Sequence, residues 1–237
     1  AKPWNTDLHS LYEIRESDKN AEILFYNIGN GNGFHICLHC GKTDINRDRL
    51  DNHRRLRGGK SENNDVACTG NNTPHAIKEN VILGGRFKTD YAEIRVRKDG
   101  SYSNDESLLY TLGAVFTKQL AAYLAIENSE LGFGIKQYDG FRTIFIFDTT
   151  KGGAGYSVQF YVHVEEIFKA AKSQLDCTCE SGCTKCIIDR DTQWHLNILN
   201  RTLALEWLQS NLDRELPNEV SSLFPNARFI LGGVKQD

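Results

Sequence analysis

The chain has 237 residues, of which 40% are hydrophobic and 25% are charged, and its formal net charge is −3. This composition predicts a globular protein with a sizeable core, and it excludes both a disordered tail and a strongly basic, free-standing nucleic-acid binder. Any contact with nucleic acid is therefore expected to be local. No segment approaches the roughly 18 apolar residues of a membrane helix and no signal peptide is evident, so we expect a cytoplasmic protein without a membrane partner.

The first half of the chain is predicted to be rich in strands. Residues 21–29 are aliphatic and aromatic and end in GNGNG, which is typical of a strand that enters a turn. Residues 44–74 are polar with little periodicity, which predicts a long loop that a metal organises. Residues 81–98 alternate apolar and polar side chains beyond Gly85, which indicates a half-exposed strand or a hairpin.

The second half is predicted to be more helical. Asn104 or Asp105 can cap a helix that extends to Leu124, and two short strands flank residues 139–140. The IFIF run in the second of these strands indicates a fully buried strand that ends at Asp148. Helices are expected over residues 156–175 and 193–212.

This order of elements predicts an α+β or mixed α/β fold. The expected division is a β-rich region, residues 1–103, with a zinc-organised loop, followed by an α/β region, residues 104–237, with a four-cysteine knuckle. The two regions could equally form one integrated domain.

Seven cysteines occur in the chain, an odd number that argues against complete pairing. The cytosol keeps thiols reduced, so metal ligation is favoured over disulfides. Cys177, Cys179, Cys183 and Cys186 place four soft ligands within ten residues, close enough for one tetrahedral zinc ion. Four unrelated buried thiols are the alternative, but so short and polar a stretch offers no core to hold them. Because four thiolates close the coordination shell, the expected role of this zinc is structural.

A second zinc site is expected around the Cys-x-x-Cys pair in the first half of the chain. Its candidate ligands are Cys37, Cys40, Cys68 and His53. His53 is favoured because it lies within the polar loop, while His75 and His39 are alternatives for the fourth position. A reduced pair of turn cysteines without metal is the competing interpretation.

Two loops are candidates for contact with phosphate. Lys151, Gly152, Gly153 and Gly155 join a predicted strand to a helix, where backbone N–H groups could approach an anion at the helix N-terminus. The glycines could equally permit only a tight connection.

The second candidate loop is basic and lies between the expected ligands of the second zinc site. Arg54, Arg55, Arg57 and Lys60 cluster there, as a patch for a DNA backbone or as an ordinary solvated loop.

Several ordered motifs resemble a known family. FDTTKGGAGY, CTCESGCTKC and IIDRDTQWHLNILNRTLALEWL resemble the C-terminal zinc-binding domain of MrfA-type (mitomycin repair factor A) helicases. GFHICLHCGK, HRRLRGG, CTGN and LGGRFKTDYAEIRV are similar to the version found in phage-defence systems such as DISARM and Druantia. The resemblance covers residues 33–208.

This resemblance implies zinc ligation by the four knuckle cysteines. It also implies a superfamily 2 helicase motor as partner, in cis or in trans, that acts on DNA in repair or antiviral defence. The sequence departs from such helicases because it contains neither a P-loop nor a DEAH-like box, so independent ATP hydrolysis is not expected.

Three functions are compatible with these features. The leading one is a non-catalytic zinc-binding accessory domain of a DNA helicase or anti-phage defence complex, which contacts DNA, the motor or both. The second is a metal-dependent nuclease or nucleotide-binding hydrolase that uses Asp148 and the GGAG loop with Asp90 or Asp191. The third is a pure assembly scaffold without affinity for DNA.

Overall fold

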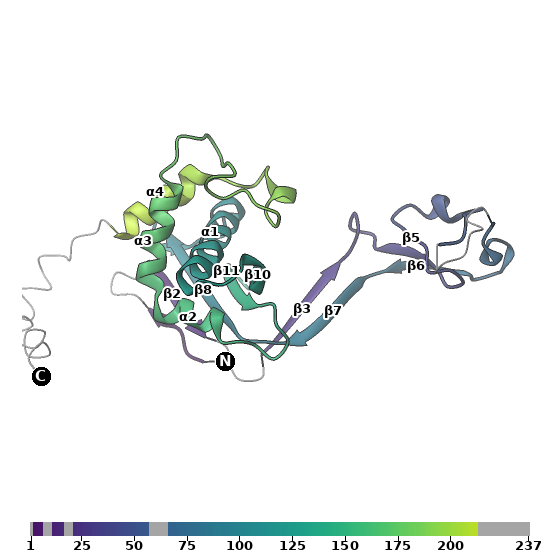
Figure 1. Cartoon of the computed structure of the whole chain (residues 1–237), viewed down its shortest axis with the longest axis horizontal. Helices are drawn as coiled ribbons and strands as arrows, with labels where there is room; N and C mark the ends of the chain where they lie inside the picture. Colours follow the sequence, from purple (N-terminus) through teal and green to yellow (C-terminus); the bar gives the residue numbers. More distant parts are fainter. Residues whose placement is uncertain (1, 7–10, 17–20, 57–65, 213–237) are drawn as a thin grey trace, which may run out of the picture. The chain divides into compact units, whose positions relative to one another are not determined.

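A computed structural model describes residues 2–6, 11–16, 21–56 and 66–212 of the chain. The chain divides into two compact units, one made of residues 22–88 and the other of residues 1–21 with 89–237 (Figure 1). The expected junction between residues 103 and 104 falls inside the larger unit. Strands from both sides of that junction pair directly, with Ile94 opposite Ile144, so residues 89–103 belong to the same unit as the helices that follow.

The larger unit is built on an antiparallel six-stranded sheet. Along the sheet the order is β1 (Asn5–Thr6), β2 (Tyr12–Glu16), β8 (Tyr91–Lys98), β11 (Phe141–Asp148) and β10 (Leu131–Tyr138), and β9 (Ser101–Tyr102) pairs with β8.

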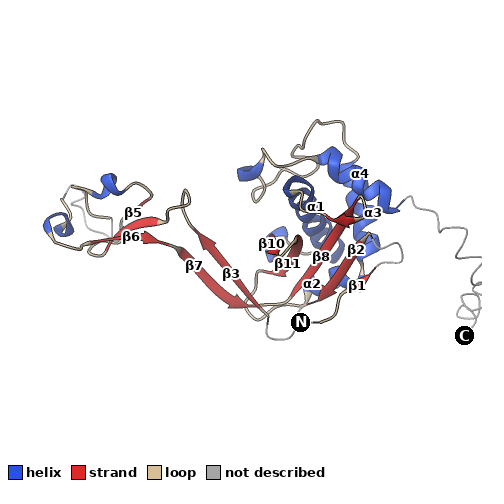
Figure 2. Cartoon of the chain, turned by 180° about the vertical axis from the view of Figure 1, so that it is seen from behind, coloured by secondary structure: helices blue, strands red, loops and turns tan. Residues whose placement is uncertain are grey.

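Four α-helices pack on one face of this sheet (Figure 2). They are α1 (Glu106–Leu124), α2 (Tyr156–Val162), α3 (Val164–Leu175) and α4 (Arg201–Leu212), with the short 3-10 turns η3 (Asn128–Glu130) and η4 (Gln193–His195). Ile94, Ile144 and Ile146 of the sheet meet Phe116 and Phe168 of the helices in one buried cluster. None of the helices within the described part of the chain is long and apolar enough to cross a membrane.

The predicted first helix is confirmed, and Asp105 is its cap, with its side chain accepting from the N–H of Leu108. The predicted helix over residues 156–175 is interrupted at His163, whose backbone leaves helical geometry and whose ring contacts that of Tyr123 at an angle of 41°. The last helix begins at Arg201 rather than at residue 193.

Asn200 explains the late start of this helix. Its side chain accepts from the N–H of Leu203, while its own N–H donates to the Thr111 hydroxyl. Asn200 thus caps the helix and fixes its first turn against α1.

The prediction that the IFIF run is fully buried is wrong for its two phenylalanines. Ile144 and Ile146 are completely buried, whereas Phe145 and Phe147 are half-buried on the opposite face of β11. A short apolar run has the same composition whether one face or both faces are covered, so periodicity cannot separate the two cases.

The smaller unit consists of a two-stranded ribbon and a three-stranded sheet. The ribbon pairs β3 (Glu22–Asn27) with β7 (Leu83–Lys88), and the sheet has the order β5 (Thr43–Asp44), β4 (Phe34–Cys37) and β6 (Ile77–Val81), with the turns η1 (Arg47–Leu50) and η2 (Thr69–Asn72). The predicted strand over residues 21–29 is therefore confirmed. Residues 81–98 do not form a hairpin, because β7 pairs with β3 while β8 pairs with β2 and β11.

The predicted fold class is confirmed: the N-terminal half is rich in strands, and the helices lie mainly in the C-terminal half. The four-cysteine segment follows α3, and the second group of cysteines lies in the smaller unit.

Candidate metal centres

The cysteine knuckle between α3 and α4 brings four sulfur atoms together. Its members are Cys177, Cys179, Cys183 and Cys186, whose sulfurs all lie within 4.8 Å of one another. The Sγ–Sγ distance is 3.6 Å for Cys179 and Cys186 and 3.7 Å for Cys183 and Cys186. A disulfide would require about 2.05 Å, whereas a tetrahedral zinc with bonds of about 2.3 Å sets its sulfurs about 3.8 Å apart. The spacing and the soft donor set therefore fit zinc.

The knuckle is joined to the core of the larger unit. Cys186 and Ile187 are completely or almost completely buried and belong to the main hydrophobic cluster. Gly182 is required by packing, since a Cβ at this position would lie 2.9 Å from the side chain of Ile187. Loss of the knuckle's geometry would therefore disturb the core and not only a surface loop.

Basic side chains hold the knuckle's carbonyl groups. Arg201 at the start of α4 donates to the carbonyls of Cys179 and Leu175, each at 2.9 Å, and Lys118 of α1 donates to the carbonyl of Cys186 at 2.9 Å. Sequence reasoning missed both residues, because Arg201 follows the knuckle by fifteen positions and Lys118 precedes it on a different helix. They fix the backbone that carries the ligands, as supporting residues around metal sites do.

The knuckle thiols differ in acidity. Backbone N–H groups of Lys185 and Cys186 lower the pKa of Cys183 to about 6. Burial, together with the neighbouring sulfurs, raises the pKa of Cys179 to about 12. A zinc ion binds all four sulfurs as thiolates, so metal binding overcomes this difference and releases protons.

The second group lies in the smaller unit and unites Cys37, Cys40, His53 and Cys68. Their ligand atoms all lie within 4.8 Å of one another, with 3.7 Å between the sulfurs of Cys37 and Cys68. Cys37 ends β4, and the polar loop that follows contributes the other ligands. Three thiolates and one imidazole are a usual donor set for structural zinc.

The ring of His53 is oriented for ligation. Its Nδ1 lies 2.6 Å from the carbonyl oxygen of Leu50, which can only accept, so Nδ1 carries the proton. Its Nε2 is thereby left as a lone-pair donor, 3.2 Å from the sulfur of Cys40. The alternatives His39 and His75 are exposed and do not belong to this group.

The thiols of Cys40 and Cys68 in the second group are shifted in opposite directions. Burial raises the pKa of Cys40, but hydrogen bonds from the backbone N–H groups of Leu56 and Lys42 outweigh burial, and the pKa falls to about 6. Burial raises the pKa of Cys68 instead. Backbone donors thus favour the thiolate form of Cys40, whereas burial favours the protonated form of Cys68.

The backbone N–H groups of the GGAG loop and the start of α2 are hydrogen-bonded to a side chain of the protein itself. The carboxylate of Asp148 is completely buried and accepts from the N–H groups of Ala154, Tyr156 and Ser157 at 2.6, 3.2 and 2.7 Å. These are the donors that a phosphate at the start of α2 would use. Gly153 is required by close packing, since a Cβ there would lie 2.2 Å from the carboxylate of Asp90. The geometry favours the tight-connection interpretation for Gly152, Gly153 and Gly155, and gives the phosphate prediction no support.

The predicted basic patch is partly described. Arg54 and Arg55 are exposed beside the second metal group, where the backbone of Arg54 bridges to Ala67. Arg57 and Lys60 lie outside the described residues.

Comparison with known proteins supports a metal-binding role. Residues 112–187, which include the whole knuckle, match the model of the MrfA Zn-binding domain. The chain contains an MrfA-type zinc-binding domain. Zinc is its cofactor, and the two groups of cysteine and histidine residues provide for as many as two ions.

A larger part of the chain is similar to a curated protein. Druantia protein DruE of Escherichia coli (strain UMEA 4076-1) is 24% identical over 213 residues, which cover 81% of this chain and 11% of DruE. The chain thus spans only a small part of that relative's length.

Solved structures of MrfA are similar in part. The crystal structure of DUF1998 helicase MrfA bound to DNA has a TM-score of 0.45 at 21% identity, covering 58% of this chain and 18% of MrfA. The structure bound to DNA and AMPPNP has a TM-score of 0.35 at 16% identity, covering 50% and 20%.

Proposed function

We propose that this chain is a non-catalytic zinc-binding accessory module of a DNA helicase in an anti-phage defence system, and that it contacts DNA. The observation that carries the proposal is the match of residues 112–187 to the MrfA Zn-binding domain, in a segment that gathers four cysteine sulfurs within 4.8 Å of one another. The name of that family refers to MrfA, which is described as a helicase bound to DNA, and the relative DruE belongs to a Druantia system. The chain would act in the cytoplasm, beside a superfamily 2 motor supplied in cis or in trans.

The role proposed for zinc is structural at both centres. Each group offers four protein ligands, which leaves no position open for a substrate or an activated water. Zinc would fix the loops that carry DNA-facing side chains, because a polar loop of this length has no core of its own.

The ligand assignment of the second centre is tested by metal content. We expect about two zinc ions per purified chain, and about one after His53→Ala, because alanine removes the ligand that the Leu50 carbonyl orients. Elemental analysis of protein dialysed against a weak chelator measures this ratio. His75→Ala is the matched control and should leave two ions. If His53→Ala retains two ions while His75→Ala does not, the fourth ligand is His75.

The proposed DNA surface on the smaller unit includes Arg54, Arg55, Arg57 and Lys60. The chain's net charge is −3, so DNA binding requires a local basic surface of this kind. Arg54 and Arg55 are exposed at the edge of the second centre, which supports their part in it.

Removal of two of these charges is expected to weaken DNA binding. We expect Arg54→Ala with Arg55→Ala to lower duplex affinity roughly tenfold at low salt, and to reduce the slope of log affinity against log salt by about two. Fluorescence anisotropy with a labelled duplex, at several salt concentrations, measures both quantities. Lys169→Ala on α3, an exposed charge on the larger unit, should change neither. Equal salt slopes for the double variant and the unmodified protein would remove this loop from the DNA surface.

A scaffold role is favoured by one observation. Leu24, Tyr26 and Ile82 on and beside the β3–β7 ribbon are 66%, 64% and 61% exposed, although they are large and apolar. A two-stranded ribbon is marginally stable alone, and such side chains commonly mark a protein interface. Docking of a motor on this ribbon is compatible with DNA contact elsewhere.

A further inference from the structure

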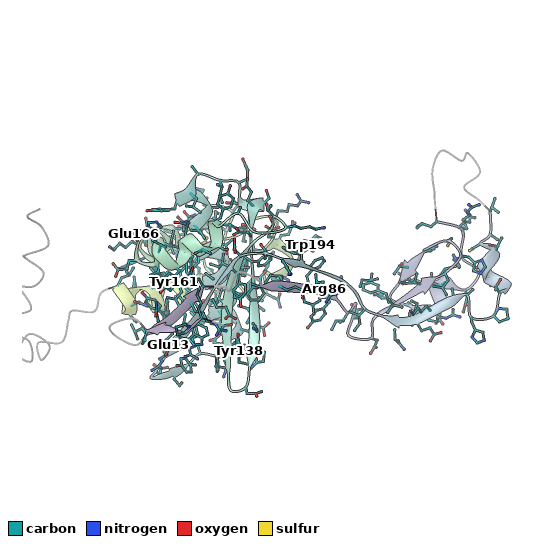
Figure 3. All side chains as sticks on the ribbon, turned by 90° about the horizontal axis from the view of Figure 1, so that it is seen from below. Glu13, Arg86, Tyr138, Tyr161, Glu166 and Trp194 are labelled. Atoms are coloured by element: carbon teal, nitrogen blue, oxygen red, sulfur yellow. The ribbon has the colours of Figure 1, made fainter. Side chains whose placement is uncertain are left out.

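The segment between the cysteine knuckle and α4 presents a tryptophan to solvent. Trp194 lies in the 3-10 turn η4 and is 80% exposed, more than any other large hydrophobic residue in the described part of the chain. Figure 3 shows it at the edge of the larger unit opposite to Glu166 of α3. Such exposure is uncommon for tryptophan, which is highly buried on average.

The turn that carries Trp194 is fixed on its N-terminal side. Thr192 is 1% exposed, and its hydroxyl donates to the carbonyl of Ile187 at 2.9 Å. The carboxylate of Asp189 accepts from the N–H groups of Asp191 and Thr192 at 2.9 and 3.0 Å. Ile187 belongs to the main hydrophobic cluster, so these bonds anchor the turn in the core of the larger unit.

The turn is also fixed on its C-terminal side. The ring of His195 contacts that of Tyr110 of α1, with centres 5.1 Å apart. Leu199 is 5% exposed and belongs to the main hydrophobic cluster. Trp194 is thus presented on a backbone that is ordered before any ligand arrives, and such preorganisation lowers the entropic cost of binding.

The surroundings of Trp194 are polar. Arg190 and Gln193 are exposed in the same segment, and within residues 187–200, all of which the structure describes, only Leu196 is a further exposed large hydrophobic residue. The core of a protein interface would bring together several apolar side chains. A single flat ring among polar groups fits instead a nucleobase, which has a flat face and a polar edge.

The charges beside Trp194 are nearly balanced. Arg190 is an exposed cation, but Asp191 next to it is an exposed anion. A DNA contact with little surplus positive charge gains little from counterion release. Stacking would therefore supply most of the affinity at this turn, and the contact would be to bases rather than to the phosphate backbone.

We propose that Trp194 stacks on an unpaired base of single-stranded DNA. The inference rests on the proposed function, to which it adds a DNA contact on the larger unit and the form of DNA bound there. Unpaired bases expose their faces, whereas a duplex keeps its bases stacked inside. An aromatic ring accepts any base, so this contact carries little sequence preference.

Removal of the ring tests the contact through affinity. We expect Trp194→Leu to weaken binding of a labelled oligo-dT of 20 nucleotides about tenfold with an unchanged salt slope, because stacking is lost and no charge is removed. Duplex affinity should stay the same. Trp194→Phe retains a ring and should lose much less affinity for oligo-dT. Tyr123→Leu on α1 removes another ring, from a residue that is 49% exposed, and should change neither affinity.

Tryptophan fluorescence reports the contact directly. The chain has three tryptophans, of which Trp207 is 6% exposed and Trp4 is half-buried. Oligo-dT should quench the fluorescence of the unmodified protein, and Trp194→Leu should abolish most of this quenching. Trp4→Phe is the matched control and should retain it. Circular dichroism and zinc content verify that each variant is folded.

The outcomes separate this inference from the proposed function. If Trp194→Leu binds oligo-dT as tightly as the unmodified protein, base stacking at Trp194 is excluded, a protein contact becomes the alternative for this ring, and DNA contact through the basic loop still stands. Equal weakening for oligo-dT and duplex would also overturn the inference, as would quenching that survives in Trp194→Leu. If the unmodified protein binds neither form of DNA, the proposed DNA contact fails together with this inference.

Discussion

Replacement of Cys186 by serine is expected to release one of two zinc ions and to lower the melting temperature of the larger unit by about 10–20 °C. A serine hydroxyl is a poor zinc ligand, and the binding energy of a structural zinc is part of the folding energy. Cys186 is completely buried beside Ile187 in the main core, so the loss of the knuckle reaches the packed helices. A loss of roughly 5 kcal/mol corresponds to the stated shift for a domain of this size.

Zinc content and thermal melting measured on the same preparation test this expectation. Thr184→Ser lies in the same segment at an exposed position that is not a ligand, and it should leave both quantities unchanged. Retention of two zinc ions by the Cys186→Ser protein, with an unchanged melting temperature, would exclude the cysteine as a structural ligand.

The knuckle could be predicted because its chemistry is local. Four cysteines within ten residues can reach one ion in almost any backbone conformation, so the spacing itself carries the information. The structure gathers the same four sulfurs. Their supports, Arg201 and Lys118, come from separate helices, and no short pattern connects those positions to the carbonyls that they hold.

The second centre shows where local information ends. Cys37 and Cys40 could be paired from their spacing, but His53, His75 and His39 were all within reach along the chain. The structure brings His53 into the group, and the carbonyl of Leu50 orients its ring. That selection depends on the path of the polar loop, which the sequence does not specify by periodicity or by a motif.

Which strands pair with each other could likewise not be predicted from the sequence. The alternation in residues 81–98 predicts a strand or a hairpin, but β7 pairs with β3 and β8 with β2, each about 60 to 80 positions away. A hairpin is the natural interpretation of adjacent strands, because the sequence signal for a turn is short-range. The half-buried state of Phe145 and Phe147 was missed for a similar reason: Gly132 and Gly134, which accommodate the rings, lie on the partner strand.

The sequence of the GGAG loop is compatible with two interpretations, a phosphate-binding loop and a tight strand-to-helix connection. A phosphate cradle and a tight connection need the same backbone freedom. The difference lies in what satisfies the N–H groups at the start of α2, and in this protein Asp148 satisfies three of them.

Replacement of Asp148 by alanine is therefore expected to destabilise the larger unit by about 2–4 kcal/mol. The substitution leaves three donors without an acceptor, in a region where Asp148 and Ser157 are completely buried. Each buried donor without a partner costs about 1–3 kcal/mol, and rearrangement of the loop recovers part of that cost. Denaturant unfolding, followed by circular dichroism, measures the difference. Asp191→Ala, at an exposed position, should change stability by no more than about 0.5 kcal/mol.

Variants of Asp148 also distinguish a structural role of its carboxylate from a catalytic role. A nuclease that used Asp148 would lose magnesium-dependent cleavage of DNA in Asp148→Asn and keep its stability, because catalytic carboxylates face the substrate. We expect instead that the substitution lowers stability and leaves the DNA substrate unaffected. Asparagine can still accept from one or two of the three N–H groups, so Asp148→Asn should be destabilised less than the alanine variant, and neither should alter the fate of a DNA substrate incubated with magnesium. A stable Asp148→Asn protein that no longer degrades DNA, next to an unmodified protein that does, would place Asp148 in an active site.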